Sequence, residues 1–248
     1  MSGFVGLDIG SSATKGALVR EGEVVATVIV PSMPDMLAAA NEALAALDAG
    51  DAPVLTTGYG RALFERRAGQ VSEITALAAG IGRLHPEART VVDIGGQDSK
   101  VVRIAAGRVA DFAMNDRCAA GTGRFLEVMS RVLHVPFDRF DEIAASGVAP
   151  LPVTSTCTVF AESEVVGLLS AQAPRAGILK GVMASISVRI AALARQVGLE
   201  DPVFATGGAM HSQALVAALS AALGVPVRVP EEPQTVTARG AAWLCAAR

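Results

Sequence analysis

The sequence has few cysteines, few aromatic residues and no block of charge of one sign. Its 248 residues include three cysteines, and an odd number of thiols argues against a framework of disulfide bonds. One tryptophan and one tyrosine provide no platform on which nucleic-acid bases could stack. A net charge of −3 without a basic segment also argues against nucleic acid as the main partner.

Long apolar runs and an export signal are lacking as well. The longest apolar stretches, such as Ile190 to Ala194, are interrupted by Arg and Gln well short of the roughly 18 residues that span a bilayer. No basic region with an apolar stretch and a cleavage site precedes Phe4. We therefore expect a soluble, cytoplasmic protein without a membrane partner, long enough for one large domain or two small ones.

The chain opens with a pattern of strands around a turn of small residues. Residues 4–9, 15–19 and 24–30 predict three strands, and Glu21-Gly22 predicts the hairpin turn between the second and the third. Asp8 stands near the end of the first strand, directly before the turn that contains Gly10 and Thr14. A carboxylate thus faces a turn rich in glycine and hydroxyl groups.

This opening repeats itself further along the chain. Leu7 to Lys15 aligns with Val92 to Lys100 at a constant offset of 85 residues, and the same offset carries Gly22 onto Gly107. A register shared through strand, turn, strand and hairpin predicts an internal duplication, with two subdomains that each begin with a β-hairpin sheet. The alternative is that two unrelated glycine turns follow two strands.

The two turns have the chemistry of a phosphate site. Small residues let backbone N–H groups approach a phosphate, and hydroxyl groups or a lysine add further contacts. An aspartate at each strand end can hold a hydrated Mg²⁺, while Gln97 and Asp98 are polar groups placed to orient an attacking water. Neither turn is a Walker A loop or a dinucleotide-binding fingerprint.

The rest of the chain completes an α/β pattern. Val203 to Ala205 predicts a strand that ends at Thr206-Gly207-Gly208, where paired glycines allow close approach of a flat ligand. Cys245, in the last predicted helix, is expected to pack in the core. The other expected elements are helices over residues 36–47, 178–197, 212–223 and from about 235, helical patterns from about 62 to 83, and strands over 53–57 and 225–229.

The other two cysteines lie in two similar stretches, residues 114–125 and 155–162. In each, a small polar run carries one thiol, Cys118 or Cys157, and residues with helical spacing follow. We therefore expect both thiols at or just before a helix N-terminus, where the helix dipole favours the metal-binding thiolate. A metal or cluster site is one interpretation, and two buried cysteines that pack as small apolar residues are the other.

These motifs together resemble a known family. Asp93 to Asp98, Asn115 to Phe125 and Ser155 to Glu164 resemble the activator ATPases of 2-hydroxyacyl-CoA dehydratases, whose wider family includes the ATPase subunits of benzoyl-CoA reductase. The two Asp-Ile-Gly turns with Thr206-Gly207-Gly208 resemble the acetate kinase, sugar kinase, Hsp70 and actin superfamily. The resemblance implies two duplicated ribonuclease-H-like α/β subdomains with an ATP cleft between them. We expect subdomain I over residues 1–88, with a C-terminal helix (235–248) packing back on it, and subdomain II over 89–234, carrying the cluster cysteines.

The resemblance also implies a function, that of an ATP-dependent one-electron donor. It implies an oxygen-sensitive homodimer that binds ATP or ADP with Mg²⁺, accepts electrons from ferredoxin or flavodoxin and reduces a 2-hydroxyacyl-CoA dehydratase or a related reductase. One [4Fe–4S] cluster takes four thiolates, which two copies of Cys118 and Cys157 would supply. An ATPase subunit of a benzoyl-CoA-type reductase, a small-molecule kinase and a nucleotide-gated scaffold without redox chemistry remain alternatives.

Site residues follow from the resemblance, position by position. Asp8 and Asp93 would organise Mg²⁺ and, with Gln97, form the catalytic set, while Cys118 and Cys157 would be the cluster ligands. Thr57 to Arg61 and Glu73 also fit the family, without an assigned role. The expected nucleotide-binding residues are Gly10, Ser11, Ser12, Thr14, Lys15, Gly95, Gly96, Gln97 and Asp98 at the phosphates, and Gly207, Gly208 and Gln234 at the nucleoside.

Overall fold

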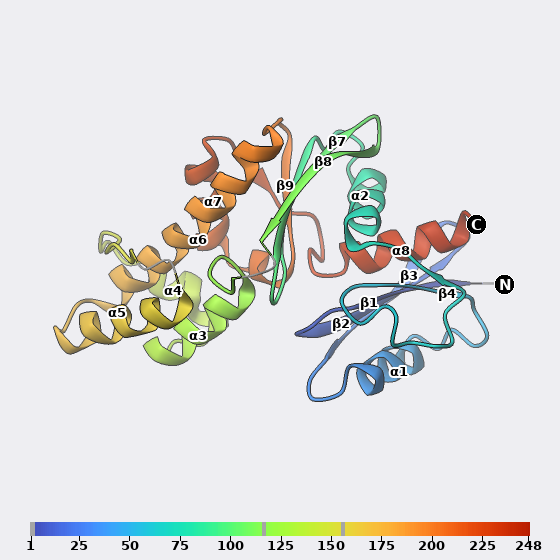
Figure 1. The fold of residues 1–248 in the computed structure, drawn as a ribbon, viewed down its shortest axis with the longest axis horizontal. Coiled ribbons are helices and arrows are strands. Elements are labelled where there is room, and N and C mark those ends of the chain that lie inside the picture. The colour runs from blue at the N-terminus through green and yellow to red at the C-terminus, as the bar shows by residue number, and fades with distance from the viewer. Residues whose placement is uncertain (1–2, 116–117, 155–156) are drawn as a thin grey trace. The chain divides into compact units, whose positions relative to one another are not determined.

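The computed structural model describes residues 3–115, 118–154 and 157–248, which form a mixed α/β fold with two five-stranded sheets (Figure 1). By its internal contacts the chain divides into two compact units. Unit 1 comprises residues up to Val91, Val102–Asp111 and Pro230–Arg248, and unit 2 comprises Val92–Val101 and Phe112–Val229. Residues 116, 117, 155 and 156, which belong to the two predicted cysteine motifs, lie outside the described residues.

The first sheet has the strand order β3-β2-β1-β4-β5. Strand β1 pairs antiparallel with β2 and parallel with β4, which places Asp8 opposite Lys15 on one side and Thr57 on the other. The three opening strands predicted from the sequence are thus confirmed. Their bounds are Phe4–Ile9 (β1), Ala13–Arg20 (β2), Glu23–Pro31 (β3), Val54–Thr57 (β4) and Gly69–Gln70 (β5).

The second sheet repeats this order as β8-β7-β6-β9-β10. Its strands correspond to those of the first sheet one by one in chain order, so the predicted duplication is confirmed in the strand topology. The strand predicted over 225–229 is shorter than expected. The bounds are Thr90–Ile94 (β6), Ser99–Ala105 (β7), Arg108–Asn115 (β8), Val203–Thr206 (β9) and Val227–Arg228 (β10).

Among its described residues, unit 1 contains the helices α1 (Met36–Ala46), α2 (Glu73–Leu84) and α8 (Val236–Ala246). Helix α1 begins where the sequence predicts, because the side chain of Asp35 accepts hydrogen bonds from the N–H groups of Leu37 and Ala38. The helical pattern expected before Glu73 is wrong. Residues 58–68 form turns, with Phe64 buried in the core, and only β5 intervenes before α2.

Helix α8 makes direct backbone contact with β1 and α2. A Cβ added at Gly6 of β1 would lie 2.0 Å from the carbonyl oxygen of Ala238, and one at Gly240 would lie 1.9 Å from that of Ala76. Glycine at these positions lets backbones touch. Cys245, 6% exposed, is buried against this layer as predicted, so its thiol is part of the core.

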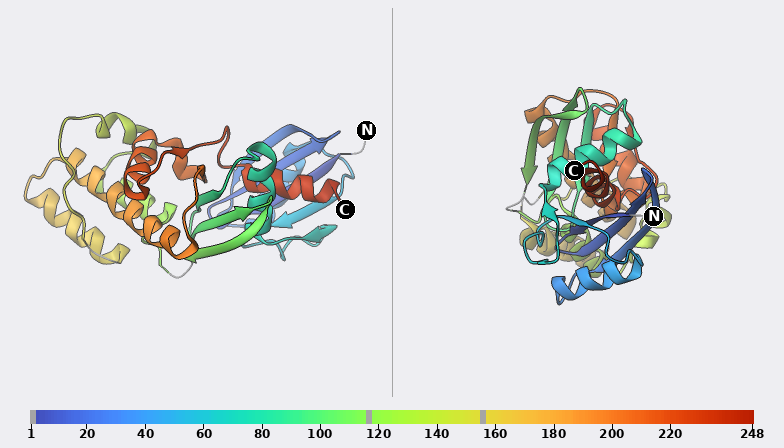
Figure 2. Two further views of the ribbon diagram at one scale, coloured as in Figure 1. Left: turned by 90° about the horizontal axis from the view of Figure 1, so that it is seen from above. Right: turned by 90° about the vertical axis from the view of Figure 1, so that its right-hand side faces the viewer.

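The helices of unit 2 are grouped on one side of β9 (Figures 1 and 2). The 23-residue helix α6 is long and apolar enough to cross a membrane, yet over half of its apolar window is buried. Ile178, Val182, Ile186 and Ile190 are among its core residues, which is typical of the central helix of a globular unit. The bounds are Gly123–Leu133 (α3), Phe140–Ala144 (α4), Thr158–Ser170 (α5), Arg175–Val197 (α6) and Gln213–Leu223 (α7), with short 3₁₀ turns at Phe137–Arg139 and Gly208–His211.

Candidate functional site

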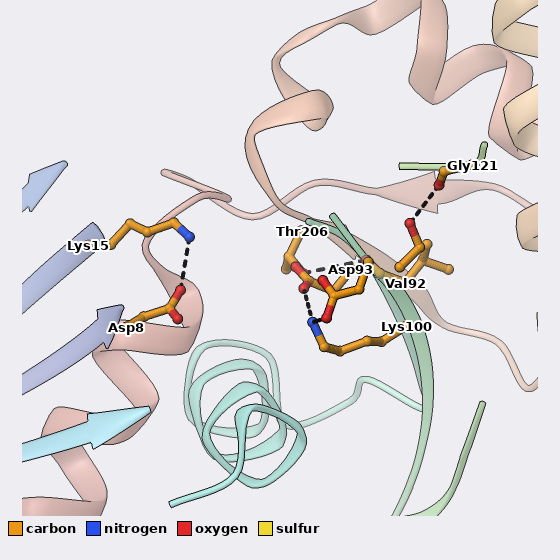
Figure 3. A network of polar contacts seen from close by, with 9 residues as sticks. Asp8, Lys15, Val92, Asp93, Lys100, Gly121 and Thr206 are labelled. Carbon is orange, nitrogen blue, oxygen red and sulfur yellow. Dashed lines mark hydrogen bonds and ion pairs between the residues drawn. The ribbon is translucent and has the colours of Figure 1, made fainter. Parts of the chain in front are cut away.

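In unit 1 the first Asp-Ile-Gly turn is built around an ion pair. Lys15 Nζ lies 3.0 Å from Asp8 Oδ2 across the β1–β2 pairing (Figure 3), and the two side chains are 17% and 10% exposed. A Cβ added at Gly10 would lie 2.8 Å from the carbonyl oxygen of Ala13 and 3.2 Å from Lys15 Nζ. Glycine therefore leaves room for the lysine beside the carboxylate.

The hydroxyl residues of this turn have different environments. Ser12 is exposed and Ser11 is half-buried, so both reach the surface of the turn. Thr14 is fully buried, and its hydroxyl lies 2.9 Å from that of Ser32, with which it forms a hydrogen bond. The Thr14 side chain thus faces the core, and no pattern in the sequence indicates its partner just after the third strand.

The stretch Thr57 to Arg61 positions Asp8. Gly58 has a φ of +88°, and a Cβ added there would lie 2.6 Å from Asp8 Oδ1 and 2.5 Å from the carbonyl oxygen of Ile9. The Gly60 N–H donates to the same carbonyl at 2.8 Å. The loop after β4 therefore packs its backbone on the carboxylate, a role that the sequence alone does not indicate.

In unit 2 the second turn gathers two carboxylates around a buried lysine. Lys100 Nζ lies 2.8 Å from Asp98 Oδ2 and 3.6 Å from Asp93 Oδ2, and its side chain is only 4% exposed. The hydroxyl of Thr206, at the end of β9, donates to Asp93 Oδ1 at 2.7 Å (Figure 3). Lys100 and Thr206 were not among the predicted site residues, although the 85-residue offset that maps Lys15 onto Lys100 could have identified the lysine.

Glycine shapes this second turn as well. The Gly95 N–H donates to the carbonyl oxygen of Asp98 at 2.9 Å, and a Cβ added at Gly95 would lie 2.5 Å from Asp98 Oδ1. Gly96 is half-buried, whereas the side chain of Gln97 is exposed at the turn. The turn is therefore closed on itself and presents Gln97 outward.

The predicted nucleoside residues fall in both units. Gly207 has a φ of +97°, and a Cβ there would lie 2.2 Å from the carbonyl oxygen of Ile94, so the end of β9 packs against the end of β6. Gly208 begins the short turn Gly208–His211 in unit 2. Gln234 is half-buried and belongs to unit 1, and Glu73 lies in the first turn of α2 in the same unit.

Both cysteines of the predicted motifs are half-buried thiols of unit 2. Cys157 is the N-cap residue of α5, as predicted, and makes no side-chain capping hydrogen bond. The prediction is wrong for Cys118, because α3 is capped by Thr122 and the cysteine lies four residues earlier. Asn115 Nδ2 holds this segment in place by donating to the carbonyl oxygens of Cys118 at 2.9 Å and Ala120 at 3.0 Å.

The donor set of one chain suits half of a sulfur-bound cluster. Among the described residues no group of three or more His, Cys, Asp or Glu could hold a metal ion. Cys118 and Cys157 are free of disulfide bonds and partly accessible. Two soft thiolate donors per chain fit a site that two chains complete.

Comparisons with known proteins relate the chain to a family of ATPases. A model of the BadF/BadG/BcrA/BcrD ATPase family matches residues 5–245. The activator of lactoyl-CoA dehydratase from Anaerotignum propionicum is 42% identical, covering 96% of this chain and 95% of that protein. The (R)-2-hydroxyglutaryl-CoA dehydratase activating ATPase of Acidaminococcus fermentans is 38% identical (96% and 95% covered), and a benzoyl-CoA reductase subunit from Thauera aromatica is 32% identical (96% and 91%).

Solved structures of dehydratase activators also match the chain over nearly its whole length. Component A of the (R)-2-hydroxyglutaryl-CoA dehydratase of A. fermentans superposes with a TM-score of 0.94 at 35% identity, covering both chains completely. The activator of the 2-hydroxyisocaproyl-CoA dehydratase from Clostridium difficile with bound ADPNP has a TM-score of 0.91 at 35% identity, covering 98% of this chain and 94% of that one. A sugar kinase, the ROK glucokinase of Streptomyces griseus, has a TM-score of 0.62 at 14% identity with both chains fully covered, which shows a common fold alone.

Proposed function

The chain belongs to the BadF/BadG/BcrA/BcrD ATPase family, and from this membership we propose that it is the ATP-dependent activator of a 2-hydroxyacyl-CoA dehydratase. In this role it hydrolyses ATP as it passes one electron to the dehydratase. The observation that carries the proposal is the nearly end-to-end similarity to proteins named as dehydratase activators. Two accessible thiols in unit 2 support it from the structure.

We propose that the two Asp-Ile-Gly turns, one in each of the predicted subdomains 1–88 and 89–234, bind the phosphates of ATP or ADP. Asp8 and Asp93 would organise Mg²⁺, which prefers carboxylate, water and substrate phosphate as ligands. Hydrogen bonds and ion pairs already orient both carboxylates. The further contacts would come from Gly10, Ser11, Ser12, Lys15, Gly95, Gly96 and Asp98 at the phosphates, from the backbone of Thr14, and from Gly207, Gly208 and Gln234 at the nucleoside.

ATP hydrolysis in this proposal uses Gln97 to orient the attacking water. Its side chain is exposed at the second turn, one residue before Asp98 and four residues after Asp93. Phosphoryl transfer asks a protein mainly for positioning and for stabilisation of charge. The ion pairs of Lys15 and Lys100 keep the carboxylates of both turns in fixed positions.

We propose further that Cys118 and Cys157 of two chains hold one [4Fe–4S] cluster in a homodimer. The bound cluster would supply a carrier for one electron, received from ferredoxin or flavodoxin in an oxygen-sensitive, cytoplasmic protein. Cys157 lies at the positive end of the α5 dipole, which would attract an anionic cluster. Glu164 of α5 accepts hydrogen bonds from the backbone N–H and the hydroxyl of Thr154, and so ties Thr154 to the helix that begins after Cys157.

Two other functions can be weighed against this one. The similarity to a benzoyl-CoA reductase subunit favours an ATPase subunit of such a reductase as the second candidate, with the same cluster and the same nucleotide chemistry. A small-molecule kinase is supported by the fold alone. A kinase has no use for two accessible thiols at these positions.

The test is to purify the protein without oxygen and to measure iron, sulfide, electron paramagnetic resonance and mass in solution. We expect about four irons per dimer. Cys118→Ala and Cys157→Ala should each lose the cluster and keep nucleotide binding, because neither residue lies in the Asp-Ile-Gly turns. Cys245→Ala, which removes the buried thiol of unit 1, is the control and should keep the iron.

The downstream partner is tested in the same preparation. Wild-type protein with ATP and a chemical reductant should activate a purified 2-hydroxyacyl-CoA dehydratase, and Cys118→Ala should not. Activation only of a benzoyl-CoA-type reductase would favour the second candidate. Iron retained by Cys118→Ala, or phosphorylation of a small molecule by a colourless monomer, would contradict the electron-donor proposal.

A further inference from the structure

The second Asp-Ile-Gly turn and the Cys118 segment, defined here as residues 118–121, are joined by hydrogen bonds within unit 2. The N–H of Gly123 donates to the carbonyl oxygen of Gly95 at 2.8 Å, and the N–H of Arg124 donates to that of Gly96 at 2.8 Å. The Ser99 hydroxyl, at the start of β7, donates to the carbonyl oxygen of Gly121 at 2.6 Å. The turn is thus connected both to the start of α3 and to the segment that carries the cysteine.

Of these three hydrogen bonds, only the one from Ser99 ends on a residue that precedes the N-cap of α3. Gly123 and Arg124 belong to the first turn of α3, after the N-cap residue Thr122. Gly121 precedes the cap and is three residues from Cys118. Ser99 is therefore the direct link between the turn and the Cys118 segment, and its side chain is fully buried.

The planar geometry of the peptide group explains how a phosphate bound at the turn could shift the residues that contact the turn. The carbonyl of Gly95 and the N–H of Gly96 belong to one rigid, planar peptide group, and so do the carbonyl of Gly96 and the N–H of Gln97. Phosphates are bound by N–H groups of such turns. An N–H that rotates toward a phosphate turns the carbonyl of the same peptide group with it. The carbonyls of Gly95 and Gly96 hold α3, while Ser99, which follows the turn directly, holds Gly121.

Glycines keep the contact between the two segments close. A Cβ added at Gly123 would lie 3.0 Å from the carbonyl oxygen of Gly95. Gly121 has a φ of +100°, a conformation that favours glycine, and its carbonyl oxygen accepts the hydrogen bond from Ser99. At its other end the Cys118 segment is held by Asn115, which donates to the carbonyl oxygens of Cys118 and Ala120. A displacement of Gly121 is therefore passed to a short segment that is held at both ends.

We infer that Ser99 is a positioning residue that transmits nucleotide occupancy of the Gly95–Asp98 turn to the Cys118 segment. This inference rests on the proposed function, because it needs a nucleotide at the turn, but it does not need the cluster. Nucleotide binding and the position of the cysteine are then coupled inside one unit. The coupling requires the Ser99–Gly121 hydrogen bond in particular.

Hydrogen–deuterium exchange of the full-length protein tests this link. Overlapping peptides separate the turn (95–98), the Cys118 segment and the start of α3 (123–126), each measured with and without saturating Mg-ADP. In the wild type we expect nucleotide to slow exchange in all three, by about fivefold in the Cys118 segment, the size expected for one hydrogen bond of ordinary strength. In Ser99→Ala, protection of the turn and of α3 should persist, while that of the Cys118 segment should fall below about twofold.

Two measurements separate this role from a general loss of stability. The Kd for ADP, measured by calorimetry, should stay within about threefold of the wild type, since the turn itself is intact. Ser187→Ala is the matched control: Ser187 is also fully buried, in unit 2, and its hydroxyl donates to the carbonyl oxygen of Met183 at 2.8 Å, away from the turn. This variant should keep the wild-type nucleotide effect in all three peptides.

The outcomes are distinct. Unchanged nucleotide protection of the Cys118 segment in Ser99→Ala overturns the inference. So does a wild-type protein in which ADP protects the turn but leaves the Cys118 segment unaffected, a result that needs no variant. If ADP binds nowhere at the turn, the proposed nucleotide site fails and the inference fails with it. If the wild-type protein contains no cluster but shows the expected exchange pattern, only the electron-transfer proposal is contradicted.

Discussion

Gly58 determines how closely the loop after β4 approaches the carboxylate of Asp8. Replacement by alanine would put a Cβ within 2.6 Å of Asp8 Oδ1 at a φ of +88°. We expect Gly58→Ala to lower the free energy of unfolding by about 3 kcal/mol or more, from backbone strain and overpacking combined, and to weaken Mg-ADP binding by displacing the carboxylate. Urea unfolding and calorimetry measure the two effects.

A second glycine of unit 1 is the control for backbone strain. Gly50 has a φ of +57° and nothing within 4 Å of an added Cβ. Gly50→Ala should therefore cost only about 1 kcal/mol and leave ADP binding unchanged. Equal losses in the two variants would show that the contact with Asp8 contributes nothing beyond the strained φ.

At the same scale, the residue types of the site could be predicted from the sequence but their partners could not. Asp8 and Asp93 stand out because each precedes a turn of small residues at one offset. The partners of the site residues are distant in the sequence: Thr206, at the end of β9, donates to Asp93, and Ser32, just after β3, shares a hydrogen bond with the hydroxyl of Thr14. Such pairings depend on sheet register, which a single sequence does not display.

At the scale of the elements, helix α7 begins at a carboxylate from another helix. Asp141 of α4 accepts hydrogen bonds from the Ser212 hydroxyl at 2.6 Å and from the N–H groups of Gln213 at 2.9 Å and Ala214 at 3.0 Å. Burial raises the pKa of the Asp141 carboxyl, but these three hydrogen bonds together outweigh burial and hold the pKa below its ordinary value. The ionised carboxylate therefore stabilises the fold by fixing α4 to the N-terminus of α7.

This arrangement predicts a pH-dependent stability difference. Asp141→Asn should lower the free energy of unfolding by about 1–2 kcal/mol at neutral pH, the size of a lost helix cap. A depressed folded-state pKa means that the contribution is present above the unfolded-state pKa and is lost as pH falls through the folded-state pKa. The difference between wild type and variant should therefore shrink toward zero as urea unfolding is repeated at increasingly acid pH.

The exposed neighbour Asp138 is the control for this experiment. Asp138→Asn removes the same charge from an exposed side chain of the preceding 3₁₀ turn. It should change stability by less than about 0.5 kcal/mol at any pH. A pH-independent loss in Asp141→Asn would mean that the contribution of Asp141 is packing and not charge.

Element boundaries were predictable where a local signal marks them. Asp35 begins α1 and Gly198 follows α6, as the sequence predicts, whereas α6 begins at Arg175, directly after Pro174 and three residues before the predicted start. The sequence is misleading where tertiary packing decides. The sequence around Phe64 suggests a helix, but the residues there form turns and only Phe64 enters the core, and the segment after Cys118 is held by Asn115 before α3 begins. Neither the burial of Phe64 nor the contacts of Asn115 has a periodic signature in the sequence.

At the scale of the whole molecule, the duplication repeats the strand order but not the surroundings of the two aspartates. Asp8 is paired with Lys15 at 3.0 Å, whereas Asp93 shares Lys100 with Asp98 and accepts a hydrogen bond from Thr206. The 85-residue offset therefore predicted the position of each carboxylate, since the backbone pattern is repeated. It could not predict how each is held, because the partners differ between the copies.

One prediction nevertheless concerns both copies of the turn together. If both aspartates organise Mg²⁺ on the same nucleotide, Asp8→Asn and Asp93→Asn should each weaken Mg-ADP binding at least about tenfold, or about 1.4 kcal/mol. Wild-type protein at about 100 times its Kd for Mg-ADP should gain about 2.7 kcal/mol of stability, and at the same ADP concentration both variants should lose about 1.3 kcal/mol of that gain or more in thermal unfolding. Asp51→Asn, at an exposed turn of unit 1, should keep the full stabilisation. If only one of the two site variants weakens Mg-ADP binding, the turn keeps its fold in both copies but binds the nucleotide in only one of them.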